Sequence, residues 1–103
     1  MSAYNIRRAV FSDCIDILYV YNDANKSLGY PAQDILSTFE EMVQNNSTFV
    51  LLDKEKIIAF ISAKINSRRA FISALYVMYN KQRKGLGSKL LRFFEEDLLK
   101  KRC

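Results

Sequence analysis

The spacing of apolar residues changes along the chain and predicts where helices and strands lie. Residues 4–10 have the alternation of a short strand, with Ile6 facing inward. Ser12 is a suitable N-cap for a helix over residues 13–22. The residues expected along one face of this helix are Ile15, Leu18, Tyr19 and Asn22. A polar loop over residues 23–30 follows.

A second amphipathic helix is expected to begin at Pro31, because proline suits the first turn of a helix. Its apolar positions recur at i, i+4, i+7 and i+8, and they are Ile35, Phe39, Met42 and Val43. The polar residues 45–47 end this helix. Two consecutive helices therefore separate the first strand from the rest of the chain.

Three strands follow in close succession, at residues 48–52, 56–66 and 69–79. Their short connections require antiparallel neighbours. The third strand is apolar on both faces, which is typical of a strand covered on both sides. A last helix is expected over residues 87–101, where apolar residues recur at i+4, at Leu90, Phe94 and Leu98. The order β-α-α-β-β-β-α predicts a mixed α+β fold, with helices packed on a largely antiparallel sheet.

Composition narrows the class of protein. The chain has 103 residues, half of them hydrophobic, which suits a single domain with a real core. No apolar run is long enough to span a membrane, and the first residues lack the apolar stretch of a signal peptide, so we expect a cytoplasmic protein. The absence of His excludes a His-based triad and a His-ligated metal. The two cysteines, Cys14 and Cys103, lack the spacing of a zinc site, and no metal is expected.

The formal net charge is +5, and basic residues crowd the last third of the chain. They are Lys81, Arg83, Lys84, Lys89, Arg92, Lys100, Lys101 and Arg102. One explanation is solvation, with the last cations complementing a helix dipole. The other is an anionic ligand near residues 81–92. Nucleic acid is less favoured, because these side chains flank a glycine turn and do not line a long face.

The glycine turn joins the doubly apolar strand to the last helix, at Gly85-Leu86-Gly87. The first amides of a helix have no intrahelical partner, and the helix dipole adds positive potential there. Glycine lets the backbone approach a ligand closely, so the turn is suited to bind a phosphate group. Ser88 could add a hydroxyl to this site. The alternative is that the glycines only make a tight turn, since the spacing matches neither the Walker A loop nor the dinucleotide fingerprint.

A family resemblance rests on two neighbouring segments, Leu75-Tyr76-Val77 and the run Gln82-Arg83-Lys84-Gly85-Leu86-Gly87. Together with the order of elements, they resemble the acyl-CoA-binding core of the GNAT (GCN5-related N-acetyltransferase) superfamily. The signature of that family, Q/R-x-x-G-x-G/A after the fourth strand, matches here at all three defining positions. The opening strand, Ile6 to Ala9, and the helix start at Asp13 resemble the family as well.

The resemblance implies a ligand and a set of binding residues. The co-substrate would be acetyl-CoA, and the acceptor of the acetyl group would be an unidentified amine. The residues that would hold the CoA pyrophosphate are Gln82, Arg83, Lys84, Gly85, Leu86, Gly87 and Ser88. The pantetheine arm would pair with the strand around Leu75, Tyr76 and Val77. A main-chain amide near Val77 would polarise the thioester carbonyl.

The catalytic acid and base stay unassigned. The acidic residue that the family often has on the fourth strand has no counterpart, and Ser73 is a poor base. The resemblance also predicts that residues 1–103 form one GNAT-like domain that lacks the family's C-terminal strand, helix and strand. The strand at residues 69–79 would then be a sheet edge, which invites a homodimer or a partner chain.

Three functions therefore stay open. The first is an acyl-CoA-dependent N-acetyltransferase, or its CoA-binding part. The second is a non-catalytic GNAT-like module that acts through dimerisation or partner binding, and the third is a small nucleic-acid binder. The residues that could line an acceptor site are Tyr19, Tyr21, Asp23 and Tyr30. We favour the alternative that Tyr19 belongs to the core and the other three to the surface.

Overall fold

A computed structural model describes residues 4–26, 36–67 and 69–102. The strands are β1 (Tyr4–Arg8), β2 (Ser47–Asp53), β3 (Lys56–Asn66) and β4 (Arg69–Val77). The helices are α1 (Cys14–Lys26), α2 (Leu36–Asn45) and α3 (Leu86–Arg102), and two single 3₁₀ turns are η1 (Phe11–Asp13) and η2 (Tyr79–Lys81). The strands form one antiparallel sheet in the order β1-β2-β3-β4. The expected mixed α+β fold and its order of elements are confirmed.

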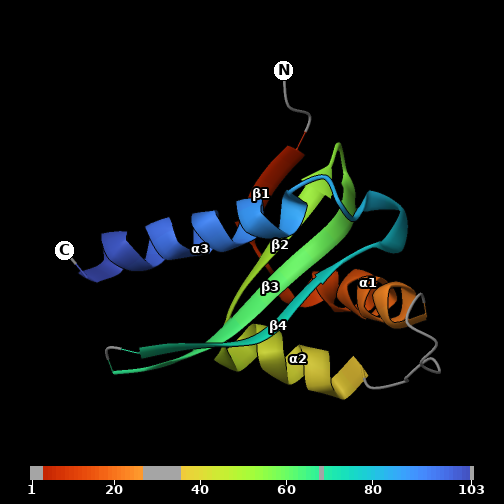
Figure 1. Ribbon diagram of the computed structural model, residues 1–103. Coiled ribbons are helices and arrows are strands. Elements are labelled where there is room, and N and C mark those ends of the chain that lie inside the picture. Colours follow the sequence, from red (N-terminus) through yellow and green to blue (C-terminus); the bar gives the residue numbers. More distant parts are fainter. Residues whose placement is uncertain (1–3, 27–35, 68, 103) are drawn as a thin grey trace.

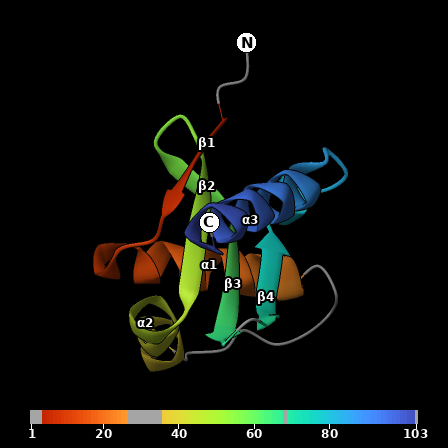
Figure 2. The same ribbon diagram turned by 90° about the vertical axis from the view of Figure 1, so that its left-hand side faces the viewer.

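Helices cover both faces of the sheet, with α1 and α2 on one face and α3 on the other (Figures 1 and 2). On the first face, the ring of Phe39 in α2 meets that of Phe60 in β3, with centroids 5.9 Å apart. On the second face, Phe49 of β2 meets Phe93 and Phe94 of α3 at 5.5 and 6.3 Å. The sheet therefore lies between two layers of aromatic side chains.

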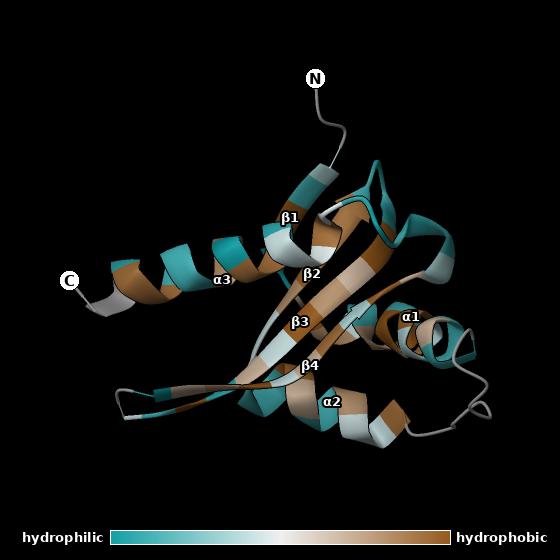
Figure 3. Ribbon diagram, in the orientation of Figure 1, coloured by the Kyte–Doolittle hydropathy of each residue, from teal (hydrophilic) through white to brown (hydrophobic). Residues whose placement is uncertain are grey.

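The strand that is covered on both faces is β3, which is buried from Ile57 to Ala63. Figure 3 shows the apolar residues concentrated along the sheet, whereas α3 alternates between apolar and polar positions. The prediction of two covered faces for residues 69–79 is wrong, because Phe71 and Ile72 are 53% and 45% exposed. The second expectation, that this strand forms a sheet edge, is confirmed within the described residues. The apolar pattern of one strand therefore fixes neither how far its faces are covered nor its place in the sheet.

The buried face of α1 differs from the predicted one. Its core residues are Cys14, Ile17, Val20 and Ala24. The predicted Ile15 and Tyr19 are 69% and 58% exposed, and only Leu18 packs against the core in part. Two apolar stripes with the same helical spacing run along this segment, so periodicity alone cannot select between them. The helix also continues past residue 22 to Lys26.

In α2, the predicted stripe is confirmed where the structure describes it. Phe39 is buried, and Met42 and Val43 pack against the core in part. The predicted start at Pro31 and the inward position of Ile35 lie outside the described residues.

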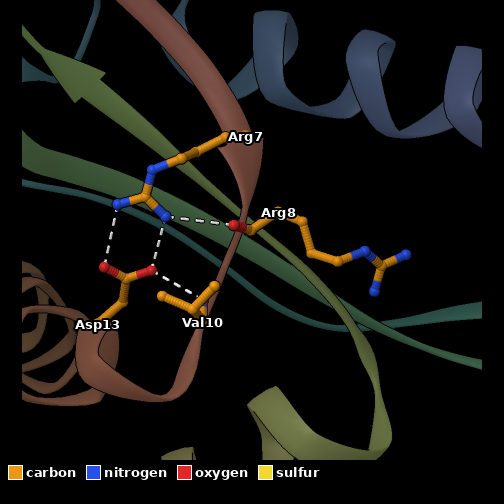
Figure 4. Close-up of polar contacts among 4 residues, drawn as sticks. All are labelled: Arg7, Arg8, Val10 and Asp13. Atoms are coloured by element: carbon orange, nitrogen blue, oxygen red, sulfur yellow. Dashed lines mark hydrogen bonds and ion pairs between the residues drawn. The ribbon is translucent and has the colours of Figure 1, made fainter.

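The connection from β1 to α1 is held by Asp13, not by Ser12 as predicted (Figure 4). Its Oδ2 accepts a hydrogen bond from Val10 N–H at 2.8 Å. Arg7 donates to both oxygens of the same carboxylate, at 2.7 and 3.1 Å. These bonds from Arg7 lower the pKa of the Asp13 carboxyl, burial opposes the shift, and the Val10 N–H lowers the pKa further. A serine hydroxyl could not make the ion pair, which explains why the carboxylate is the capping group.

Replacing Asp13 by alanine is expected to lower the free energy of unfolding at pH 7 by about 1–3 kcal/mol, because Val10 N–H and Arg7 lose their shared acceptor. The pKa of Asp13 is lowered by folding, so its contribution is present above the ordinary carboxyl pKa and is lost as pH falls through the folded-state value. Urea unfolding at several pH values measures this. Glu41→Ala, at an exposed position of α2, is the control. A difference between wild type and Asp13→Ala that stays constant into acid would contradict the prediction.

Candidate functional site: the edge of β4 and the loop before α3

The open edge of β4 presents unpaired backbone groups. Met78 N–H donates to Ile58 O at 2.9 Å, so Met78 is bonded towards β3. Residues of an antiparallel strand alternate between the two sides, so Tyr76 also pairs with β3 while Leu75 and Val77 turn towards the open edge. The side chain of Gln82 agrees with this orientation, because its Nε2 donates to Val77 O at 3.0 Å. At positions 75–77, the groups without a partner among the described residues are the N–H of Val77 and both backbone groups of Leu75.

The loop before α3 has an unusual backbone. Arg83 and Gly85 both have positive φ angles, 65° and 76°. The left-handed region is open to glycine, but it costs free energy for arginine. Lys89 N–H donates to Gly85 O at 3.0 Å, which is the first i→i−4 bond of α3. The amides of Leu86, Gly87 and Ser88 precede it and have no acceptor within the helix.

The structure gives a reason for glycine at only one of the two glycine positions of the loop. Gly85 needs its freedom because of its φ of 76°. At Gly87, no left-handed φ is present, and a Cβ would lie 3.9 Å from Val77 Cγ2, an ordinary contact. Neither packing nor backbone conformation therefore requires glycine at position 87. The tight-turn explanation accounts for Gly85 and leaves Gly87 without a reason.

Two shallow hollows flank the loop. One, of about 400 Å³, is lined by Tyr4, Lys84, Gly85, Leu86, Ser88, Lys89 and Arg92. The other, of about 290 Å³, is lined by Tyr79, Gln82 and Arg83. In the first hollow, Lys89 Nζ lies 5.6 Å from the centroid of the Tyr4 ring. Six of the seven residues predicted to hold pyrophosphate thus line these hollows. The seventh, Gly87, lies between two residues that do.

Tyr76 has a different position from its neighbours Leu75 and Val77. Its ring stacks on Phe60 with a centroid distance of 5.7 Å and meets Tyr21 edge-on at 5.0 Å. Burial raises the pKa of the Tyr76 hydroxyl, and Tyr21 adds to the shift. The side chain therefore belongs to the aromatic layer below α1 and α2.

The residues considered for an acceptor site are not divided between core and surface as predicted. Tyr19 is 58% exposed, so its assignment to the core is wrong. Tyr21 is half-buried in the aromatic layer, so its assignment to the surface is wrong as well. Asp23 accepts a hydrogen bond from Tyr79 N–H at 2.8 Å, and Tyr30 lies outside the described residues. Sequence analysis gave no signal for this link from Asp23 to the start of η2.

Several reactive groups already have hydrogen-bond partners within the protein. Ser73 Oγ donates to Ser62 O at 3.2 Å, and the Ser62 and Thr48 hydroxyls are 2.8 Å apart. Cys14 is buried, and its thiol lies 3.7 Å from Phe39 O. Burial raises the pKa of this thiol, with the Glu40 and Asp13 carboxylates adding to the shift, so it stays protonated and unreactive. Among the described residues, no group of three His, Cys, Asp or Glu is placed to hold a metal ion.

The antiparallel sheet lies between two layers of helices, and the free backbone amides at the N-terminus of α3 lie beside its open edge. This arrangement is that of an N-acyltransferase-like fold. The sequence pattern of the Acetyltransferase (GNAT) family matches residues 11–103, so this chain belongs to the GNAT family. No match is found among curated protein sequences. No helix in the described parts of the chain combines the length and the apolar character that a membrane crossing needs.

Solved structures of acetyltransferases share this fold. The PaiA N-acetyltransferase from Thermoplasma acidophilum, in complex with coenzyme A, superposes with a TM-score of 0.80 at 19% identity, over 98% of this chain and 74% of that one. The ribosomal-protein-S18-alanine N-acetyltransferase from Escherichia coli gives a TM-score of 0.81 at 22% identity, over 95% and 61%. A GNAT family acetyltransferase from Brucella melitensis, in complex with acetyl-CoA, gives 0.77 at 17%, over 92% and 68%. This chain thus spans less than two thirds of the Escherichia coli enzyme.

Proposed function

We propose that this chain binds acetyl-CoA and transfers its acetyl group to a primary amine, or supplies the CoA-binding part of an enzyme that does. The observation that carries the proposal is Gly87. It lies among the free amides at the start of α3, where a glycine serves neither packing nor backbone conformation. A close approach by a ligand supplies the missing reason. The family membership and the CoA complexes of the similar structures support the same ligand.

The pyrophosphate would lie against the amides of Leu86, Gly87 and Ser88, where the dipole of α3 favours negative charge. Lys84, Lys89 and Arg92, which line the larger hollow, would add positive charge. The pantetheine arm would then extend β4 by pairing with its open edge. These contacts would place the thioester near the outward N–H of Val77.

The chemistry follows from this placement. The lone pair of the acceptor amine attacks the thioester carbon, and Val77 N–H stabilises the negative charge that develops on the carbonyl oxygen. When the tetrahedral intermediate collapses, the C–S bond breaks and CoA leaves as its thiolate. A base or a water chain must take the proton from the amine before or during attack. Of the carboxylates in the described parts of the chain, Asp23 and Asp53 contact η2, and each is engaged in a hydrogen bond or ion pair there.

A second candidate is a non-catalytic module, favoured by the exposed edge of β4. The paired ends of β3 and β4 extend past α2 (Figure 1), and Phe71 and Ile72, near this end of β4, are exposed. A second copy of the chain, or another protein, would complete the sheet there. Such a module would work in the cytoplasm through binding alone.

Native mass spectrometry with acetyl-CoA tests both candidates, because it reports bound ligand and subunit number together. We expect one acetyl-CoA per chain, and titration calorimetry then gives the affinity. Absence of both binding heat and thermal protection at millimolar acetyl-CoA would remove the first candidate. A dimer that ignores acetyl-CoA would support the second.

A further inference from the structure

The turn η2 lies between the end of β4 and the ligand loop, and it is only one turn long. Its backbone bonds join Lys81 N–H to Met78 O at 2.9 Å and Gln82 N–H to Tyr79 O at 3.3 Å. Its N-cap residue, Met78, provides no side-chain hydrogen bond. A single 3₁₀ turn is not stable by itself, so contacts from other elements decide where it lies.

Asp23, near the end of α1, supplies such a contact. Its Oδ2 accepts the hydrogen bond from Tyr79 N–H at 2.8 Å, although the two residues are 56 positions apart in the sequence. Figure 1 shows the end of α1 close to the turn that follows β4. A carboxylate on the first N–H of a helical turn acts as an N-cap, here provided by a distant element. At the other end of η2, Lys81 Nζ lies 3.4 Å from Asp53 Oδ2 of β2.

The loop that follows needs to be held at both ends. The positive φ angle at Arg83 persists only when the surrounding structure fixes it. The downstream end is fixed by Leu86, which is 3% exposed and packs in the core. Upstream, the nearest core residue is Met78, which is 5% exposed, and η2 itself has no buried residue between Met78 and the loop. The bond to Asp23, together with the Lys81–Asp53 contact, therefore holds a turn that packing leaves open.

We propose that Asp23 is a positioning residue for this loop, which ties it to α1 and sets its amides in place before a ligand arrives. The part of this inference that concerns acyl-CoA rests on the proposed function. Without the bond, the loop exchanges between conformations, and affinity falls in proportion to the binding-competent fraction. The bond also means that a displacement of α1 moves the start of the loop. A ligand that contacts α1 would therefore change the affinity of the loop for its own ligand.

Three variants test the proposal by titration calorimetry with CoA. Asp23→Ala is expected to weaken binding about tenfold, because the loop is no longer preorganised. Asp23→Asn is expected to stay within about twofold of wild type, because its amide oxygen can accept the same N–H. Asp16→Ala removes the same charge from an exposed position of α1 and is expected to bind as wild type does. Equal affinity of Asp23→Ala and wild type would overturn the role in binding.

Hydrogen exchange without ligand gives a readout that does not need CoA. The hydrogen-bonded amides at the two ends of the loop, those of Lys81, Gln82 and Lys89, are expected to exchange faster in Asp23→Ala, but not in Asp23→Asn or Asp16→Ala, while β3 keeps its protection. Unchanged exchange in the loop, or an equal rise throughout the sheet, would overturn the proposal. If wild type itself fails to bind CoA, the proposed function fails, and the exchange experiment alone decides the role of Asp23.

Discussion

Gly87→Glu is expected to abolish CoA binding, with a loss of at least about 100-fold, while the chain stays folded. The new carboxylate would occupy the space in front of the α3 amides and repel the pyrophosphate. Folding should tolerate it, because the Cβ makes only an ordinary contact of 3.9 Å with Val77. A negative charge in the first turn also favours the helix. Calorimetry with CoA and thermal unfolding without it measure the two effects separately.

Matched variants at the same position separate size from charge. Gly87→Ala should bind CoA with a modest loss and gain about 0.5–1 kcal/mol in stability, because alanine is the better helix former. Gly87→Gln has the size of glutamate without its charge and should lie between the two in affinity. Wild-type affinity in the glutamate variant would refute the assignment of the loop.

Val77→Pro is expected to weaken acetyl-CoA about tenfold and to leave the affinity for adenosine 3′,5′-bisphosphate unchanged. Proline removes the N–H that points to the open edge, which only the acetyl thioester at the end of the pantetheine arm would use, and one hydrogen bond accounts for about this factor. Comparing the two ligands by calorimetry isolates the contribution of the arm and its thioester.

Proline one residue earlier provides the contrast. Tyr76→Pro removes an N–H that pairs with β3 and also the ring that stacks on Phe60, so it should destabilise the fold by about 3 kcal/mol or more. Tyr76→Ala measures the share that comes from the ring alone. Val77→Pro should cost much less, because an edge strand tolerates proline where its N–H faces outward. Equal destabilisation of the two variants would show that the orientation of the strand edge is assigned wrongly.

Local features of this fold were predictable, because neighbouring residues determine them. The limits of β3, Lys56–Asn66, agree with those expected from turn residues and apolar content. The seven loop residues are contiguous in sequence, so their proximity needed no knowledge of the fold. The use of their amides follows from the start of a helix, which a strand, two glycines and an apolar stripe predict together.

Features that depend on distant contacts were not predictable. Ser12 and Asp13 are both suitable capping residues, and only the position of Arg7 across the connection selects Asp13. The two apolar stripes of α1 are distinguished only by the sheet on which the helix packs. Asp23 gives no local sign of its bond to Tyr79. In each case the deciding group comes from another element, and its position depends on the whole fold.

The order of the strands also has a consequence for folding. The strands β2, β3 and β4 follow one another in sequence and in the sheet, so pairing them closes only short loops. The first strand is different, because β1 pairs with residues of β2 more than 40 positions later in the chain. Closing that long segment costs more entropy, so the three-stranded meander can form before it. The ion pair between Arg7 and Asp13 spans only six positions, so it can join β1 to η1 without closing a long loop.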